Sequence, residues 1–470
     1  MKTKFFFQSP QRLIFRLASI SFFLVAFAFT SYAVAASSEQ VQIEAKVSQT
    51  VLLQNSDNTI YLDVTIKAPT QTLTAPQTRP TDMLIILDRS GSMSAEKKIS
   101  FAKAAIHDVL AQLTNNDRFG LVSFSTNAIV HSPLVPINEA NRENLNRIVD
   151  TIPADGSTNM GEGLQFALKL LTDNHHGERL KKALLLSDGQ ANQGISDPQG
   201  LAFIVGQIAK TGTVLSTIGM GLDFNETLMT SLADYGMGHY SYLEELSGLG
   251  EILEKDLTDT RSIYASASTI DVTLGSGVAL VDAGGYPIAP LGGNSVRIMT
   301  GQILDNTDKH FVMTFAVPTQ KTGALSLGSV QLNYQTGKNQ LQTRLPDTHL
   351  KLSVVDTSRQ NEAVKSVNAD VYKKTWTENN LGRMKKALSD SVREGNKTKA
   401  QQTINEYRQA VEKAQKVSNV PLLTPDVEKE LNTMNSQVEE SFKGEAAEQD
   451  VKRKRSAKSI QRDSVYQQRK

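Results

Sequence analysis

The strongest constraint on the fold of this chain is the continuous apolar run Met83–Leu87, which ends in Asp88 and is followed by Ser90 and Ser92. A continuous apolar run of this length fits a strand buried on both faces of a parallel sheet. Open α/β sheets hold their ligands just beyond the carboxyl ends of the strands. A carboxylate and two hydroxyls at that point offer oxygen donors, which hard divalent cations such as Mg²⁺ prefer.

Two later segments repeat this arrangement. Thr158 lies in a loop that opens a helical stretch, and Asp188 follows a second apolar strand, Leu184–Ser187. Three oxygen-bearing loops in this order resemble the metal-ion-dependent adhesion site of von Willebrand factor A (VWA) domains. The resemblance covers residues from about 81 to 257 and is strongest to exported bacterial members and to inter-α-trypsin inhibitor heavy chains.

The resemblance implies specific roles for five residues. Ser90, Ser92 and Thr158 would offer their hydroxyl oxygens directly to Mg²⁺ (or Mn²⁺ or Ca²⁺). Asp88 and Asp188 would act mostly through water or hydrogen bonds. A cation with few direct carboxylate ligands keeps an excess of positive charge, so it would bind an acidic residue of a protein partner. This predicts an exported, metal-dependent protein-binding or adhesion module.

Two alternatives remain open. The first is an envelope scaffold or assembly protein without a metal-dependent ligand, in which the polar groups only cap helices. We expect such capping or loop hydrogen bonding for the adjoining Ser187 and Asn159. The second is a Mg²⁺-dependent hydrolase with an aspartyl nucleophile, but Ser90 and Ser92 stand where such enzymes need a further carboxylate. The chain also lacks a nucleophile elbow, a P-loop and a His-Glu-x-x-His motif, so we expect no enzyme.

The first 35 residues have the layout of a secretory signal peptide. Basic residues precede an apolar core at 17–29, and small residues around Ala33-Val34-Ala35 fit a cleavage site. The core is short for a membrane span, although a retained anchor is the alternative. We therefore expect export to the periplasm, the cell surface or the medium, with no transmembrane span after cleavage. The chain has no cysteine, so its domains must be stable without disulfides.

The hydrophobic periodicity divides the chain into regions. Alternating strand and helix patterns predict a doubly wound parallel-sheet VWA domain, whereas period-2 alternation before and after it predicts a flanking antiparallel β-sandwich. A charged stretch with a helical period predicts a C-terminal helical hairpin region. The predicted boundaries are a signal peptide at 1–35, a β segment at 36–68, a linker at 69–80, the VWA domain at 81–257, the β-sandwich at 262–355, a helical region at 359–442 and a basic disordered tail at 443–470.

The two strands predicted within 36–68 are too few to be stable alone. We therefore expect them to pair with the later β domain, so that the VWA domain is inserted into it. Integrin β subunits resemble this arrangement, and there a shift of the last helix couples the metal site to the flanking domain. The corresponding helix here would be 246–257.

Charge is unevenly distributed along the chain. The net charge of +1 is the balance of +4 in residues 1–35, −10 in residues 36–451 and +7 in residues 452–470. Nucleic acid is not an expected partner of an exported protein. The basic tail is instead expected to be solvated, or to contact an anionic surface.

Overall fold

The computed structural model describes residues 40–56, 58–69, 79–173, 179–243, 246–337 and 339–469. The predicted signal peptide at 1–35 and most of the predicted linker at 69–80 lie outside these ranges. Within them, no helix combines the length and the apolar character that a membrane span requires.

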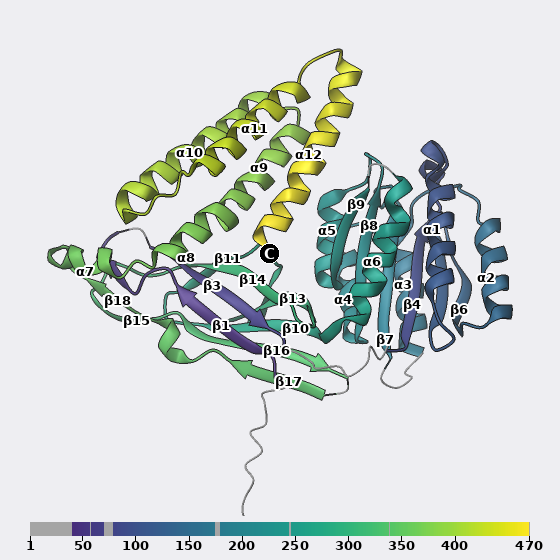
Figure 1. The fold of residues 1–470 in the computed structure, drawn as a ribbon, viewed down its shortest axis with the longest axis horizontal. Helices are drawn as coiled ribbons and strands as arrows, with labels where there is room; N and C mark the ends of the chain where they lie inside the picture. Colours follow the sequence, from purple (N-terminus) through teal and green to yellow (C-terminus); the bar gives the residue numbers. More distant parts are fainter. Residues whose placement is uncertain are drawn as a thin grey trace, which may run out of the picture. The chain divides into compact units, whose positions relative to one another are not determined.

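Six strands form the sheet of the α/β domain, in the order β6-β5-β4-β7-β8-β9 (Figure 1). All neighbouring strands are parallel except β5 and β6, which are antiparallel. This confirms the predicted doubly wound parallel sheet. The strands are β4 (Thr81–Asp88), β5 (Arg118–Phe124), β6 (Ala128–Pro136), β7 (Leu180–Ser187), β8 (Thr213–Met220) and β9 (Met237–Leu243).

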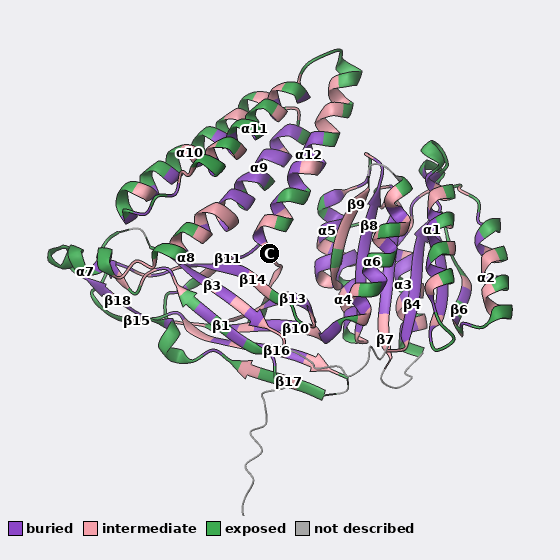
Figure 2. Cartoon of the chain, in the orientation of Figure 1, coloured by how far each residue is buried: buried purple, intermediate pink, exposed green. Residues whose placement is uncertain are grey.

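Helices cover both faces of this sheet, and the alternation of side chains along β4 shows why. Met83, Ile85 and Leu87 belong to one apolar core, whereas Leu84 and Ile86 belong to the other. A strand buried on both faces reads as a continuous apolar run, and Figure 2 shows β4 and β8 buried along their length. The first core contains α1 (Lys98–Gln112), α2 (Glu139–Thr151) and α6 (Leu249–Arg261), and the second contains α3 (Met160–Asp173), α4 (Pro198–Lys210) and α5 (Glu226–Tyr235).

The two edge strands of this sheet, β6 and β9, were not predicted from the sequence. β6 contains Pro133 and Pro136 and is only partly buried, as expected of an edge strand. β9 carries few aliphatic residues and is of intermediate burial or exposed throughout. Edge strands lack the apolar pattern by which the inner strands are recognised.

The β domain contains two larger antiparallel sheets around one apolar core. The first has the order β1-β3-β14-β11 and the second the order β12-β13-β10-β16-β17, and a small sheet, β15-β18-β2, completes the domain. The bounds are β1 (Gln42–Val47), β2 (Val51–Leu53), β3 (Thr59–Lys67), β10 (Ile263–Leu274), β11 (Ala279–Ala283), β12 (Ile288–Gly292), β13 (Ser295–Leu304), β14 (Asp308–Ala316), β15 (Gly323–Ser326), β16 (Gly328–Thr336), β17 (Asn339–Arg344) and β18 (Lys351–Val355).

The strands that precede the α/β domain in the sequence lie inside these sheets. β3 is bonded to β1 on one side and to β14 on the other, with Leu62 opposite Met313 and Val64 opposite Phe311. β2 pairs with β18 in parallel. The β domain is thus built from the chain segments that precede and follow the α/β domain in the sequence. Its strand β10 begins two residues after α6 ends.

The helical region begins with the short helices α7 (Gln360–Lys365) and α8 (Ala369–Lys374) and continues through a π-helical turn at Thr375–Asn380. Four longer helices follow and share one apolar core: α9 (Leu381–Arg393), α10 (Lys397–Ser418), α11 (Pro425–Ser441) and α12 (Ala446–Gln468). Gly395, with a φ of 74°, forms the turn between α9 and α10, where the sequence predicted a helical hairpin.

The prediction of a disordered tail at 443–470 was wrong, because residues 446–468 form α12. Only two apolar side chains of α12, Ala457 and Ile460, join the core of the helical region. Polar contacts hold the helix instead: the Ser464 hydroxyl donates to the Gly382 carbonyl at 2.7 Å, and the Ser389 hydroxyl donates to the Ala457 carbonyl at 2.8 Å. A composition low in apolar residues therefore did not indicate disorder here.

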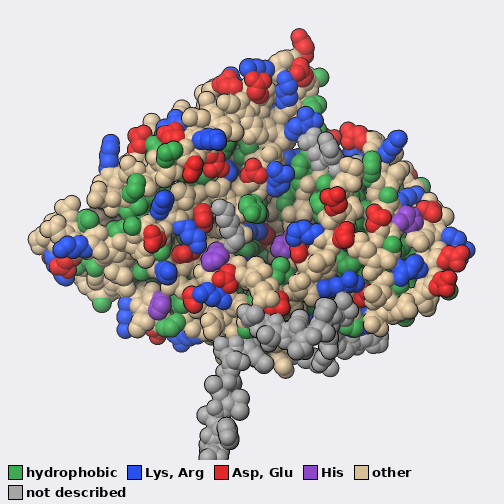
Figure 3. Space-filling view, viewed as in Figure 1, with side chains coloured by type: hydrophobic (Ala, Val, Ile, Leu, Met, Phe, Trp, Pro, Cys, Tyr) green, Lys and Arg blue, Asp and Glu red, His purple; other side chains and the backbone are tan. Residues whose placement is uncertain are grey.

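On the face shown in Figure 3, acidic and basic side chains are interspersed. The basic residues of α12 are not all exposed to solvent, since Lys458 is buried. Several of them contact acidic residues of the α/β domain. Lys454 Nζ lies 2.9 Å from Asp223 Oδ1, and Arg469 donates to Asp234 Oδ2 at 2.9 Å. The expectation of a solvated basic tail is therefore corrected as well.

Candidate metal centre

Asp88 ends β4, and its carboxylate is buried at the carboxyl edge of the sheet. Its Oδ1 accepts a hydrogen bond from the backbone N–H of Ser90 at 2.8 Å, and its Oδ2 accepts one from the Ser187 hydroxyl at 2.6 Å. Ser187 is the last residue of β7, so this bond joins the ends of two neighbouring strands. The bond agrees with the loop hydrogen-bonding role predicted for Ser187.

The hydroxyls that follow β4 meet the loop after β7. The hydroxyl oxygens of Ser90 and Ser92 lie 3.1 Å apart, and the Ser92 hydroxyl donates to Asp188 Oδ1 at 2.8 Å. Both serines lie where the chain enters the short 3-10 helix η1 (Gly91–Lys97). Asp188 is buried directly after β7.

Thr158 completes the group from a third loop. A Cβ atom placed on Gly189 would lie 3.5 Å from Thr158 Oγ1, 3.8 Å from Asp88 Oδ2 and 3.8 Å from Ser92 Oγ. Two of these oxygens come from the loop after β4 and one from the loop before α3, and all three lie at ordinary contact distance from the Cβ position of Gly189 in the loop after β7. The structure brings all five residues of the predicted site together.

The loop that carries Thr158 is fixed by backbone contacts. The Gly91 N–H donates to the Gly156 carbonyl at 3.0 Å, and the Thr158 N–H donates to Asn192 Oδ1 at 2.9 Å. Gly156 has a φ of 73°, and a Cβ there would lie 2.5 Å from Thr126 Oγ1, so a side chain at this position would clash. Asn159 accepts a hydrogen bond from the Glu162 N–H at 3.3 Å, in the capping role predicted for it.

Sequence reasoning missed Lys98, which donates through Nζ to Asp188 Oδ2 at 2.7 Å. The side chains of this pair are 5% and 0% exposed. Glu96 and Lys97 both have positive φ values, so the chain turns sharply before α1 and places Lys98 inside while Lys97 stays exposed. The sequence Lys97-Lys98 offers no signal that separates the two lysines, because this turn decides which one is buried.

Burial dominates the electrostatics of the site. It raises the pKa of Asp88 to about 6, against the opposing effect of the hydrogen bonds from Ser187 and Ser90, and the neighbouring Asp188 raises it further. A raised carboxyl pKa means that the negative charge is poorly solvated. A cation near Asp88 would relieve this penalty.

The donor set fits a hard divalent cation. Hydroxyl and carboxylate oxygens are the ligand types that Mg²⁺ and Ca²⁺ prefer, and such oxygens lie around the Cβ position of Gly189. Across the described ranges, no cluster of three or more His, Cys, Asp and Glu side chains has the arrangement of a metal site. The donors at this edge are therefore mainly hydroxyls, with two carboxylates behind them.

Comparison with known proteins agrees with this fold and this geometry. Residues 82–255 match the sequence model of the von Willebrand factor type A domain. This part of the chain is a VWA domain. Proteins of this family commonly serve as metal-dependent modules for protein interaction.

Curated relatives share the VWA domain with this chain. The Escherichia coli protein YfbK is 29% identical over 177 residues, which are 37% of this chain and 30% of YfbK. Human inter-alpha-trypsin inhibitor heavy chain H4 is 30% identical over 162 residues, which are 33% of this chain and 17% of the heavy chain. The similarity thus spans less than a third of the length of these two relatives.

Solved structures resemble a larger part of the chain. A von Willebrand factor type A protein from Catenulispora acidiphila matches 91% of this chain and 97% of its own, with a TM-score of 0.66 and 16% identity. The ArnB paralog VWA2 from Sulfolobus acidocaldarius matches 90% of this chain and 98% of its own, with a TM-score of 0.52 and 16% identity. At this identity the likeness concerns the fold, and it extends beyond the VWA domain to most of the described chain.

Proposed function

We propose that the VWA domain binds a divalent cation and through it captures an acidic side chain of a partner protein. Ser90, Ser92 and Thr158 would hold Mg²⁺ (or Mn²⁺ or Ca²⁺) by their hydroxyl oxygens, with Asp88 and Asp188 acting through water or hydrogen bonds. The observation that carries this proposal is the convergence of the oxygens of Asp88, Ser92 and Thr158 around the Cβ position of Gly189.

Counting charge explains why the partner would be acidic. Asp88 and Asp188 carry two negative charges, and Lys98 cancels one of them through its bond to Asp188. A divalent cation would leave this site with a net positive charge. A partner carboxylate is the group that best neutralises such a charge with a further oxygen ligand.

The experiment is a calorimetric titration with Mg²⁺ and Mn²⁺ of the wild type, of Asp88→Ala and of a control, Asp173→Ala. Asp173 is an exposed carboxylate at the end of α3, so the control removes the same charge away from the site. We expect Asp88→Ala to weaken metal binding and Asp173→Ala to leave it unchanged. Equal affinity in all three proteins would contradict the metal site.

We further propose that the protein binds without catalysing a reaction. Support comes from Ser90 and Ser92, which stand where an aspartyl-phosphatase mechanism needs a further carboxylate. The observation that would overturn this is metal-dependent hydrolysis of phosphoesters that disappears in Asp88→Ala.

Export to the periplasm, the cell surface or the medium is part of the same proposal. It is supported by the signal-peptide pattern of residues 1–35. Fractionation of cells that express the full chain, followed by N-terminal sequencing of the mature protein, tests it. A product in the cytoplasm that retains residues 1–35 would contradict it.

A further inference from the structure

A groove of about 1160 Å³, here called the α4 groove, lies between helix α4 of the VWA domain and strands β10, β13, β16 and β17 of the β domain. Binding sites for small molecules commonly have volumes of about 300–1,000 Å³, so this groove has room for an extended ligand. A hydrogen bond between the Nε2 atoms of His239 in β9 and Gln302 in β13, at 2.6 Å, joins the two domains.

One face of α4 forms the first wall of the groove. Gln199, Phe203, Gly206 and Lys210 line it at intervals of four, three and four residues, which place them along one side of a helix. The apolar residues on the other side of α4 belong to the core of the VWA domain. The side chain of Phe203 is 68% exposed. A large exposed aromatic ring on a concave surface is a feature of ligand sites.

Gly206 leaves the surface beside Phe203 open. A glycine inside a helix is destabilising relative to alanine, because its backbone loses more freedom on folding. A Cβ atom on Gly206 would meet nothing within 4 Å, so no contact with the described residues requires a glycine here. Side chains three residues apart are neighbours on a helix, so the missing side chain exposes the ring of Phe203 to the groove.

Amide side chains form the second wall. Where β16 pairs with β17, Asn333 lies opposite Gln342 and Gln335 lies opposite Gln340. Because side chains alternate between the two faces of a sheet, these four amides share one face, and all four line the groove. The intervening Tyr334 belongs to the core of the β domain. The amides therefore present both donors and acceptors of hydrogen bonds to the groove.

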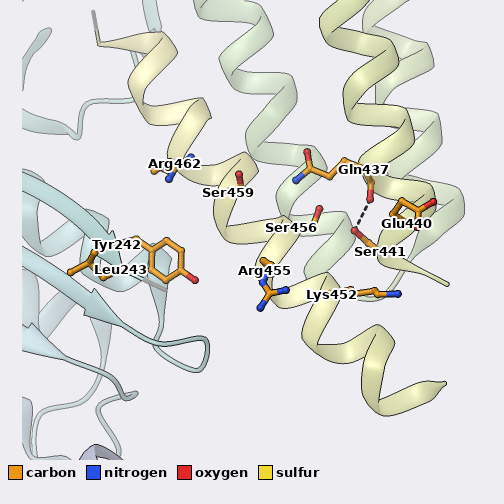
Figure 4. Close-up of a pocket in the computed structure, with 10 residues that line it drawn as sticks. All are labelled: Tyr242, Leu243, Gln437, Glu440, Ser441, Lys452, Arg455, Ser456, Ser459 and Arg462. Atoms are coloured by element: carbon orange, nitrogen blue, oxygen red, sulfur yellow. Dashed lines mark hydrogen bonds between the residues drawn. The ribbon is translucent and has the colours of Figure 1, made fainter. Parts of the chain in front are cut away.

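Charge contributes little to this lining. The described residues that line the groove include two basic side chains and no acidic one. The first, Arg297, donates through Nε and Nη2 to the two carboxylate oxygens of Asp271 at 2.6 and 2.8 Å, so its charge is neutralised. The second, Lys210, lies exposed at the end of α4. The cavity of about 600 Å³ between β9 and α12 differs in this respect, because basic side chains such as Arg455 line it (Figure 4).

Two residues with unusual backbone conformations also line the groove. Met237 has a φ of 57° and Ala267 a φ of 54°, although residues with aliphatic side chains rarely adopt positive φ values. Around Ala267 the pairing of β10 with β13 and β16 changes register. Bulges and strained residues concentrate beside binding sites, so these two positions favour a functional role for the groove.

We propose that the α4 groove binds a neutral oligosaccharide. The hydroxyls of a sugar are uncharged and both donate and accept hydrogen bonds, so they match the amides of the second wall. The C–H groups of a sugar ring form flat apolar faces, which pack on an aromatic ring such as that of Phe203. A chain of such rings fills an extended groove. The described lining residues include none of the five residues of the metal centre, so this site goes beyond the proposed metal-dependent function.

The test uses the full chain in buffer with EDTA, so that its result does not depend on the metal centre. The probes are end-labelled cellohexaose, maltohexaose and chitohexaose, followed by fluorescence anisotropy. We expect at least one of them to bind, with the same affinity at low and high salt because no charge is involved. Phe203→Ala should weaken this binding roughly tenfold by removing the aromatic ring. The matched control Tyr466→Ala removes an aromatic side chain that is 72% exposed on α12 and should bind like the wild type.

Gly206→Leu separates a blocked groove from a damaged fold. Leucine favours a helix more than glycine does, and its Cβ has free space. Thermal unfolding of this variant should therefore show a midpoint no lower than that of the wild type, whereas hexasaccharide binding should fall at least tenfold because the side chain covers Phe203.

Four outcomes would overturn the proposal. They are binding of none of the three hexasaccharides, wild-type affinity in Gly206→Leu, an equal loss of affinity in Tyr466→Ala, and binding of a neutral peptide of Ser, Gln and Thr in place of the sugars. The last outcome would change the class of ligand from carbohydrate to polypeptide. None of them bears on metal binding, which is measured separately.

Discussion

Replacing Lys98 by Met tests how the buried ammonium of Lys98 affects the stability of the metal-free protein and its affinity for the metal. The substitution keeps the length of the apolar part of the side chain and removes the ammonium that lies 2.7 Å from Asp188 Oδ2. Both side chains are almost fully buried, at 5% and 0% exposure, so solvent screens their interaction little. Two effects of opposite sign follow, one on the stability of the metal-free protein and one on metal affinity.

The metal-free protein should lose stability. Removing one partner of a buried ion pair leaves a charge uncompensated and typically costs about 3–5 kcal/mol. Asp188 keeps its hydrogen bond from Ser92 at 2.8 Å, so we expect the lower end of this range, about 3 kcal/mol. Urea denaturation in EDTA measures this loss.

Metal affinity should rise. Two unit charges 4 Å apart interact by about 1 kcal/mol in bulk water and about 4 kcal/mol at the effective dielectric constant of protein sites. Lys98 and a divalent cation would both face Asp188, so removing the ammonium should relieve at least about 1.4 kcal/mol of repulsion, a tenfold gain in affinity. Calorimetric titration with Mg²⁺ at constant ionic strength measures it.

The exposed Lys97 provides the matched control, because Lys97→Met removes the same charge one residue away from the buried site. We expect it to change metal affinity less than twofold, as surface charges are well screened. If Lys98→Met binds Mg²⁺ no more tightly than the wild type, or if Lys97→Met gains as much, the electrostatic argument is refuted. Lys98→Gln, which keeps a polar group beside Asp188, serves if the Met variant does not fold.

Three further substitutions test other parts of the structure. Gly156→Ala should cost about 1–3 kcal/mol, because φ is positive and the new Cβ would meet Thr126, and it should weaken Mg²⁺ binding in the same titration. Asp234→Asn should destabilise the protein in urea denaturation by about 1–3 kcal/mol, because the partly buried Arg469 loses its ionic partner, and an unchanged midpoint would show that α12 is not anchored there. Burial raises the pKa of Glu226 to about 7, so the stability that its protonated form contributes is present below about pH 4.5 and is lost as the pH rises through 7. The unfolding free energy of Glu226→Gln, measured relative to that of the wild type, should therefore rise between about pH 5 and pH 8. A difference that does not change with pH would contradict the raised pKa.

The parts of the fold that the sequence predicted correctly are those in which local pattern and tertiary environment agree. The inner strands β4, β7 and β8 are buried on both faces and read as continuous apolar runs. The amphipathic helices of the VWA domain show the 3.6-residue period of a face that packs on the sheet. The oxygen-bearing loops at the ends of β4 and β7 were placed correctly because parallel strands end at the same edge.

The parts that the sequence missed depend on contacts between distant residues. Lys98 is buried only because Glu96 and Lys97 adopt positive φ values and turn the chain before α1. Neither glutamate nor lysine is a residue type that favours this left-handed conformation, so the sequence does not predict the turn. Asn192 supports Thr158 from a loop 34 residues further along the chain. Such positions acquire their roles from the folded structure, whereas the motif residues carry theirs in the local sequence.

The wrong prediction of a disordered tail at 443–470 shows that composition alone does not reveal contacts with distant parts of the chain. A stretch with few apolar residues and a charge of +7 would be disordered if it had to fold alone. In the folded chain, Asp223, Glu226 and Asp234 of the VWA domain face α12, and Lys454, Lys458 and Arg469 lie against this acidic side. The uneven charge of the sequence thus becomes a complementary contact between distant parts of one chain.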